Sequence, residues 1–275
     1  MISLPPDIDR VIEDAWQAAQ EVPGFLGEKE ARFLGLLAAC IPAEGAIVEI
    51  GSFKGRSTVM LAKVASHYGR GPVVAIDPHT QILSTARDED AHPSTYDEFV
   101  EALRRAGVEK HVDVRHSFSK DVVRTWDQPV RFLWIDGDHS YSGAKADFDG
   151  FLPFVSAMGV VALHDALNNF PGPIRVFVEE MLRPDRFGPA GFVQSIAWAQ
   201  LRPLDSAAFA VQRKQLERRA ARLIPFVKDK AELRGLEKIR YKLNRSRVPR
   251  SPLSTAEMAR LLSAAPSGSE VKAVQ

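Results

Sequence analysis

The sequence predicts an α/β fold: a doubly wound, mostly parallel seven-stranded sheet of the Rossmann-like kind, with a C-terminal antiparallel hairpin and helical extensions. Three observations predict it. Short apolar segments alternate with helical segments between residues 46 and 182. The apolar segments are continuous, as in strands that are buried on both faces of a parallel sheet. Further on, two apolar segments, 192–201 and 207–213, are joined by a short polar linker, which indicates a hairpin.

The individual elements follow from the hydrophobic periodicity. Two amphipathic helices are expected ahead of the sheet, over 8–21 and 27–41. Parallel strands are expected at 46–50, 72–76, 112–115, 131–135 and 159–163. The intervening and following helices are expected at 57–68, 93–106, 119–126, 144–154 and 174–182. Residues 214–245 predict a further helical stretch that is broken near Pro225.

A chain of 275 residues suits one domain with appendages. We expect N-terminal helices over 1–45, a ligand-binding domain over 46–213 and a basic helical extension over 214–275 with a disordered end. The single cysteine, Cys40, lies in an apolar helical segment and is expected to be a buried thiol. The sequence shows neither a signal peptide nor an apolar run of about 18 residues, so we expect a cytoplasmic protein.

Polar residues follow each predicted parallel strand. They are Glu49 to Ser52, Asp77, Ser117, Asp136 to His139, and the pair His164-Asp165. Ligands of open parallel sheets bind outside the carboxyl ends of the strands. Residues from all five strand ends are therefore expected to share one site.

The first of these loops predicts a nucleoside-binding turn. Gly51 and Gly55 allow a tight backbone and a close ligand, and a helix begins near Ser57 with free amides that suit a carboxylate as well as a phosphate. Phe53 occupies the place of the second glycine of a dinucleotide-binding loop, and the loop is not a Walker A motif either. Asp77 suits the two ribose hydroxyls of a nucleoside without identifying the nucleoside. A plain strand-to-helix connection is the alternative.

The segments Trp134-Ile-Asp-Gly-Asp-His-Ser-Tyr141 and Val161-Ala-Leu-His-Asp165 give the clearest resemblance to a known family. From about Gly27 to Arg213 the chain resembles the bacterial O-methyltransferases that include macrolide-sugar methyltransferases and proteins labelled cephalosporin hydroxylase. The resemblance implies a class I S-adenosylmethionine-dependent methyltransferase that acts on a hydroxyl of a sugar or natural product. Its implied cofactor-binding residues are Glu49, Gly51, Ser52, Gly55, Ser57, Asp77, Ser117 and Asp136.

The same resemblance implies a divalent metal, usually magnesium, held by Asp136, His164 and Asp165, with His139 as the general base beside Asp136. A bound cation lowers the pKa of a hydroxyl, and imidazole groups accept protons near neutrality. His164 departs from the family pattern, because magnesium prefers oxygen ligands. Three alternatives stay open: His164 is not a ligand, the metal is a transition metal, or the site works without a metal.

The net charge of +1 hides a basic segment. Residues 201–250 hold 15 Lys and Arg against 5 Asp and Glu. We expect this arm to pack its apolar stripe (Leu216, Leu223, Ile224, Phe226 and Val227) on the body or on a second copy in a homo-oligomer such as a dimer. Peripheral membrane contact is an alternative. Nucleic-acid binding is not expected, since no aromatic residues are interleaved with the charges.

Two other functions compete with methyl transfer to a small-molecule hydroxyl. One is a nicotinamide-dependent oxidoreductase, against which Phe53 and the terminal hairpin both argue. The other is a non-catalytic nucleoside-binding protein whose basic arm binds a nucleic acid or a membrane.

Overall fold

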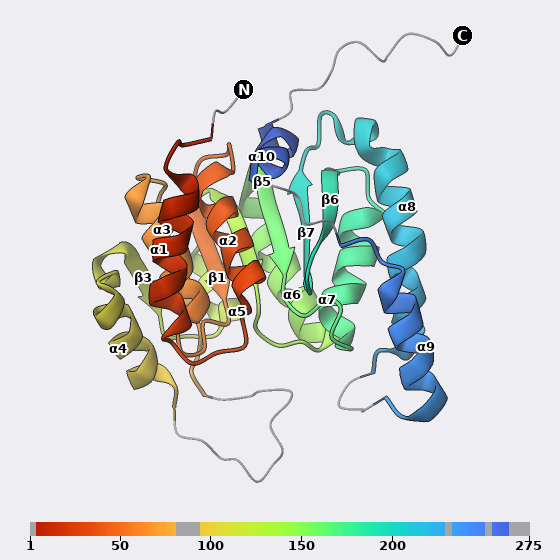
Figure 1. The fold of residues 1–275 in the computed structure, drawn as a ribbon, viewed down its shortest axis with the longest axis horizontal. Coiled ribbons are helices and arrows are strands. Elements are labelled where there is room, and N and C mark those ends of the chain that lie inside the picture. The colour runs from red at the N-terminus through yellow and green to blue at the C-terminus, as the bar shows by residue number, and fades with distance from the viewer. Residues whose placement is uncertain (1–3, 81–93, 229–232, 251–254, 264–275) are drawn as a thin grey trace.

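The computed structural model describes residues 4–80, 94–228, 233–250 and 255–263, and shows two helices followed by alternating strands and helices (Figure 1). The strands are β1 (Ala46–Ile50), β2 (Val73–Ile76), β3 (Val112–Arg115), β4 (Val130–Ile135), β5 (Val155–Leu163), β6 (Phe187–Val193) and β7 (Ile196–Leu201). The α-helices are α1 (Ile8–Gln20), α2 (Glu28–Cys40), α3 (Arg56–His67), α4 (Tyr96–Ala106), α5 (Ser119–Val122), α6 (Tyr141–Phe151), α7 (Pro171–Val176), α8 (Ala210–Ala220), α9 (Gly235–Ser246) and α10 (Thr255–Ser263). Short helical turns adjoin them: η1 (Glu109–His111), η2 (Val123–Thr125), η3 (Leu152–Phe154), η4 (Phe177–Leu182), η5 (Ser206–Phe209) and η6 (Ala221–Phe226).

The strands form one seven-stranded sheet in the order β3-β2-β1-β4-β5-β7-β6. β1 to β5 are parallel, and β7 runs antiparallel to both β5 and β6. The predicted fold class is confirmed.

The position of the terminal hairpin differs from the prediction. The turn lies at Gln194 and Ser195, inside the segment that was expected to be one strand, and Gln194 has a left-handed φ of 53°. The first strand is β6, whose two glycines and proline hide the strand pattern; a Cβ on Gly191 would lie 3.2 Å from the indole nitrogen of Trp198. Residues 207–213, the expected second strand, instead belong to η5 and α8, because this alanine-containing segment lies beyond the sheet and favours a helix.

Helices cover both faces of the sheet, and successive residues of each strand face opposite layers. One core joins α1 to α4 and α10 to strand residues such as Ile47, Phe132 and Trp134. The other core joins α6 to α8 to Val48, Leu133 and their neighbours. Cys40 is buried in the first core, as expected.

The register of the sheet brings the carboxyl ends of the central strands together. Ile50 of β1 pairs with both Ile76 of β2 and Ile135 of β4, and Ile135 pairs with Leu163 of β5. The backbone bonds continue one residue further, since the amide of Asp136 donates to Ile50 O (2.8 Å). The residues that follow these strands therefore lie along a single edge.

The basic extension runs along the second core and then returns. Leu216, Leu223 and Val227 are buried against the sheet layer, which confirms the prediction that this apolar stripe packs. The helix α10 returns to the first core, where Met258 and Leu262 are buried. The predicted disordered end lies outside the described residues. Within the described part of the chain, no helix is long and apolar enough to cross a membrane.

Candidate active site

A cavity of about 410 Å³ opens at the carboxyl ends of the parallel strands, within the usual range for small-molecule sites. Seven of the predicted site residues line it: Gly51, Ser57, Asp77, Asp136, His139, His164 and Asp165. Four others do not: Glu49, Ser52, Gly55 and Ser117. The sequence therefore located the cavity but assigned part of its lining to residues behind it.

The turn after β1 requires glycine for a steric reason. Gly51 has a left-handed φ of 90°, and a Cβ there would lie 2.3 Å from the backbone oxygen of Asp136. Gly55, at φ 96°, precedes the first turn of α3, whose Ser57 lines the cavity. The free amides at the start of α3 make this wall suited to an anionic group.

The carboxylate of Asp77 ties the first two strand-end loops together. Its Oδ2 accepts a hydrogen bond from the amide of Phe53 (2.7 Å), and its Oδ1 accepts one from the amide of His79 (2.6 Å). Each oxygen keeps a second lone pair, so Asp77 can hold its loops and still accept hydrogen bonds from a ligand.

Glu49 lies behind the loop and is fully buried. The hydroxyl of Thr58 donates to its Oε2 at 2.5 Å. Burial raises the pKa of Glu49 to about 7, although the hydroxyls of Ser57 and Thr58 act to lower it. Ser52 is also buried beneath the turn. As placed, both residues support the loop from behind.

At the other wall, Asp136 is hydrogen-bonded to two histidines. Its Oδ1 lies 3.2 Å from His139 Nε2 and 3.0 Å from His164 Nδ1. Burial acts to raise the pKa of Asp136, but the charge of His164 and the hydrogen bonds from both histidines lower it to about 2. Asp136 is therefore ionised at neutral pH and can only accept hydrogen bonds.

That constraint fixes the tautomer of His139. Because Asp136 accepts, Nε2 of His139 carries the proton, and Nδ1 of the neutral ring holds the lone pair. Nδ1 faces Asp165 Oδ2 at 3.9 Å, too far for a direct hydrogen bond. Asp165 itself has a left-handed φ of 55°, a strained conformation of the kind that gathers at functional sites. In the neutral form of the ring, the lone pair of His139 Nδ1 is thus turned toward the carboxylate of Asp165 at the cavity wall.

Sequence reasoning missed Glu30 on α2. Its Oε1 accepts hydrogen bonds from both the amide (3.0 Å) and the hydroxyl (2.5 Å) of Ser195, in the β6–β7 turn. Its Oε2 lies 3.5 Å from His164 Nε2. Burial acts to raise the pKa of Glu30, but the hydrogen bond and charge of His164 and the bonds from Ser195 lower it to about 2. Glu30, His164 and Asp136 form a carboxylate–imidazole–carboxylate chain that ends at the cavity, where the side chain of Asp136 is 20% exposed.

This chain bears on the predicted metal site. Burial acts to lower the pKa of His164, but Asp136, Glu30 and Asp165 raise it well above the ordinary value of 6.5. Both ring nitrogens of His164 are directed at carboxylates, Nδ1 at Asp136 (3.0 Å) and Nε2 at Glu30 (3.5 Å). In this arrangement Asp136, His164 and Asp165 do not fit a metal-binding triad, and among the described residues no group of three or more such side chains does. Of the alternatives stated above, the geometry favours the one in which His164 is not a ligand.

Three further positions refine the prediction. Asp138, beside Asp136 in sequence, accepts hydrogen bonds from the amide and hydroxyl of Ser140 and so shapes the start of α6. Near the predicted Ser117, the cavity is lined instead by Phe118, Ser119 and Lys120. Asp147 of α6, which the sequence did not single out, lines the cavity and accepts a hydrogen bond from Ser119 (2.5 Å); burial raises its pKa to about 6.

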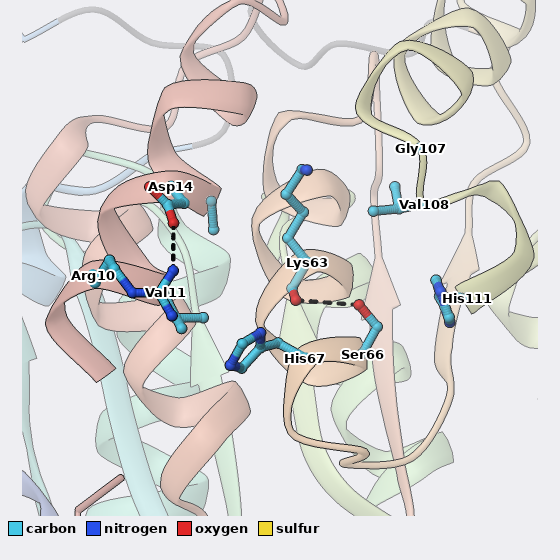
Figure 2. A pocket seen from close by; sticks show the side chains of 10 residues that line it. Arg10, Val11, Asp14, Lys63, Ser66, His67, Gly107, Val108 and His111 are labelled. Carbon is cyan, nitrogen blue, oxygen red and sulfur yellow. Dashed lines mark hydrogen bonds and ion pairs between the residues drawn. The ribbon is translucent and has the colours of Figure 1, made fainter. Parts of the chain in front are cut away.

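A second depression, of about 310 Å³, lies between α1, α3 and the segment after α4 (Figure 2). Lys63, Ser66 and His67 come from the last turns of α3, whereas the first turn of α3 lines the larger cavity. Figure 2 shows Arg10 turned toward its ion-pair partner Asp14 (3.1 Å). This depression is far from the strand ends, and its exposed charges indicate no reaction site.

Comparisons with known proteins agree with this fold. Residues 48–166 match the family model described as a methyltransferase domain. The fold is similar to that of the O-methyltransferase NovP, with a TM-score of 0.56 and 15% identity over 71% of this chain and 98% of that one. It is also similar to an O-methyltransferase from Bacillus cereus solved in complex with SAH, with a TM-score of 0.51 and 22% identity over 74% and 93% of the two chains.

Proposed function

We propose that this chain, whose residues 48–166 match the family model of a methyltransferase domain, transfers a methyl group from S-adenosylmethionine to a hydroxyl of a small molecule such as a sugar or natural product. One observation carries the proposal: His139, Asp136 and Asp165 line the same cavity as the glycine turn and the start of α3. The proposed nucleoside site and the imidazole of His139 thus line one cavity.

The cavity residues suit this cofactor. The amides at the start of α3, near Ser57, would hold the methionine carboxylate, and Asp77 would accept hydrogen bonds from the ribose hydroxyls. Gly51 lets this turn pass directly against the backbone of Asp136, where a Cβ would lie 2.3 Å from the carbonyl oxygen. We retain Ser117 as a candidate residue beside the adenine of the cofactor. Glu49, Ser52 and Gly55 are proposed to hold the loop in place. When bound, the cofactor supplies an electrophilic methyl group on a sulfonium centre.

The protein supplies the base and the positions of the reactants. Nδ1 of His139 accepts the proton of the acceptor hydroxyl, and Asp136 stabilises the resulting imidazolium through Nε2. Asp165, 3.9 Å from Nδ1, is placed to accept a hydrogen bond from a neighbouring hydroxyl of the acceptor. Holding the two reactants at attack distance provides most of the acceleration in such a reaction.

Calorimetry tests the cofactor directly. We expect S-adenosylhomocysteine to bind and NADH to bind far more weakly, if at all. A preference for NADH would establish the oxidoreductase alternative and overturn the proposal. Binding of S-adenosylhomocysteine without methyl transfer to any hydroxyl acceptor in a screen of sugars and phenols would favour the non-catalytic alternative. We also propose a homo-oligomer, which sedimentation equilibrium measures.

A further inference from the structure

The helix α9 is attached to the body by one face only. Tyr241 is its buried residue; its hydroxyl donates to Leu167 O (2.8 Å) and accepts from the amide of Asn169 (2.8 Å). These two residues belong to the loop between Asp165 and Phe170, both of which line the cavity. The helix is therefore anchored to the loop that bears part of the candidate active site.

The opposite face of α9 carries an unusual exposed stripe. Leu236, Ile239 and Leu243 are 70%, 63% and 51% exposed. Spacings of three and four residues place them on one side of a helix with 3.6 residues per turn, and Tyr241 lies on the other side. Large aliphatic side chains in one row are a contiguous apolar surface rather than scattered exposed residues.

Positive charges flank this stripe on both sides. Lys238 and Lys242, one turn apart, lie along one flank, and Arg240 lies along the other. All three are exposed, and no carboxylate of the described residues forms an ion pair with them. An apolar stripe between two cationic flanks is the pattern of a helix that lies in the plane of a membrane interface.

We infer that α9 docks the protein on an anionic lipid surface, with Leu236, Ile239 and Leu243 inserted among the acyl chains and the flanking cations at the headgroups. Charge favours this partner over a second copy of the chain, because pairing two α9 stripes would bring Arg240 and Lys242 of one copy against the same cations of the other. Figure 1 shows α9 at the end of the sheet toward which β5 points, which is the end that holds the cavity. Docking through α9 would therefore bring the cavity close to the lipid.

Vesicle co-sedimentation of the full chain tests the inference. We expect binding to vesicles of phosphatidylglycerol mixed with phosphatidylcholine, and little binding to phosphatidylcholine alone. The triple variant L236S/I239S/L243S should bind the anionic vesicles roughly tenfold or more weakly, since burial of the three side chains is lost. The variant K238Q/R240Q/K242Q should also bind more weakly, and added salt should weaken the wild type.

Val211→Ser on α8 is the matched control, because Val211 is 72% exposed and lies outside the stripe. It should bind like the wild type. Unchanged melting curves of all variants would show that they remain folded, as expected for exposed positions. Absence of wild-type binding to anionic vesicles would overturn the inference. Full binding by the triple serine variant would also overturn it, because such binding would indicate a polyanion site based on charge alone. A wild-type oligomer that the triple serine variant dissociates in the absence of lipid would overturn it as well, because the stripe would then be an interface between copies of the chain.

This test is independent of the proposed methyl transfer. No residue of α9 lines the cavity, so S-adenosylhomocysteine affinity should be the same in the wild type and in the triple serine variant.

Discussion

Replacing Glu30 by glutamine removes a buried negative charge and keeps the size of the side chain. In the folded protein this carboxylate accepts two hydrogen bonds from Ser195 and faces the imidazolium of His164. Glutamine retains at most part of this network and leaves His164 with less negative charge around it. We therefore expect Glu30→Gln to destabilise the fold at neutral pH.

The size of the effect follows from the pKa of Glu30. A change from the ordinary value of 4.5 to about 2 corresponds to about 3 kcal/mol of folding free energy at pH 7. Breaking a buried ion pair by removing one partner costs about 3–5 kcal/mol in other proteins, which agrees. Because the folded-state pKa is depressed, the contribution is complete above the unfolded pKa near 4.5 and is lost as the pH falls toward 2. At pH 3 it should be about 1 kcal/mol.

Urea unfolding followed by tryptophan fluorescence at pH 7, 5, 4 and 3 measures the difference between wild type and variant. Glu28→Gln is the matched control, since Glu28 lies on the same helix and pairs with Arg32 at the surface. It should change the free energy of unfolding little at any pH. Equal stability of Glu30→Gln and wild type at pH 7, or a difference that does not shrink in acid, would refute the assigned network.

The other predictions concern turnover and the glycine turn. His139→Ala should lower kcat by about 10²- to 10⁴-fold with S-adenosylhomocysteine affinity retained; unchanged turnover of an identified acceptor would exclude His139 as the base. Gly51→Ala should lower both the melting temperature and the cofactor affinity, because its Cβ would strike the backbone of Asp136. The control is Gly69→Ala, at a position with φ 60° and no atom within 4 Å of an added Cβ. This control should lower the free energy of unfolding by only about 1 kcal/mol and leave cofactor binding unchanged. Excess EDTA should leave methyl transfer intact, because the described residues bring together no group of three or more metal-binding side chains; loss of activity that is restored by a divalent ion would contradict this.

The fold was largely predictable because hydrophobic periodicity is local. The strand 46–50 was predicted with the bounds that β1 has, and 112–115 with those of β3. The hairpin was misplaced because the glycines of β6 are explained only by side chains that the fold brings against them. A Cβ on Gly191 would lie 3.2 Å from the indole nitrogen of Trp198, and one on Gly188 would lie 2.4 Å from Arg202 Cδ. Packing between strands decided what local preference could not.

The site divides in the same way. The sequence alone determined that Gly51, Asp77, Asp136 and His164 each follow a strand, and parallel topology then places strand ends on one edge. The sequence did not determine which of the predicted site residues face the cavity. Glu49 and Ser52 lie behind the turn, and the cavity is lined by the neighbours of Ser117 and not by Ser117 itself.

Only the tertiary structure decided the state of His164. Its partner Glu30 stands 134 residues away in the chain, on a helix that sequence patterns identified only as amphipathic. This second carboxylate, 3.5 Å from Nε2, is one of the groups that raise the pKa of His164 well above its ordinary value. Protonation depends on distance and burial in space, which no spacing along a sequence specifies.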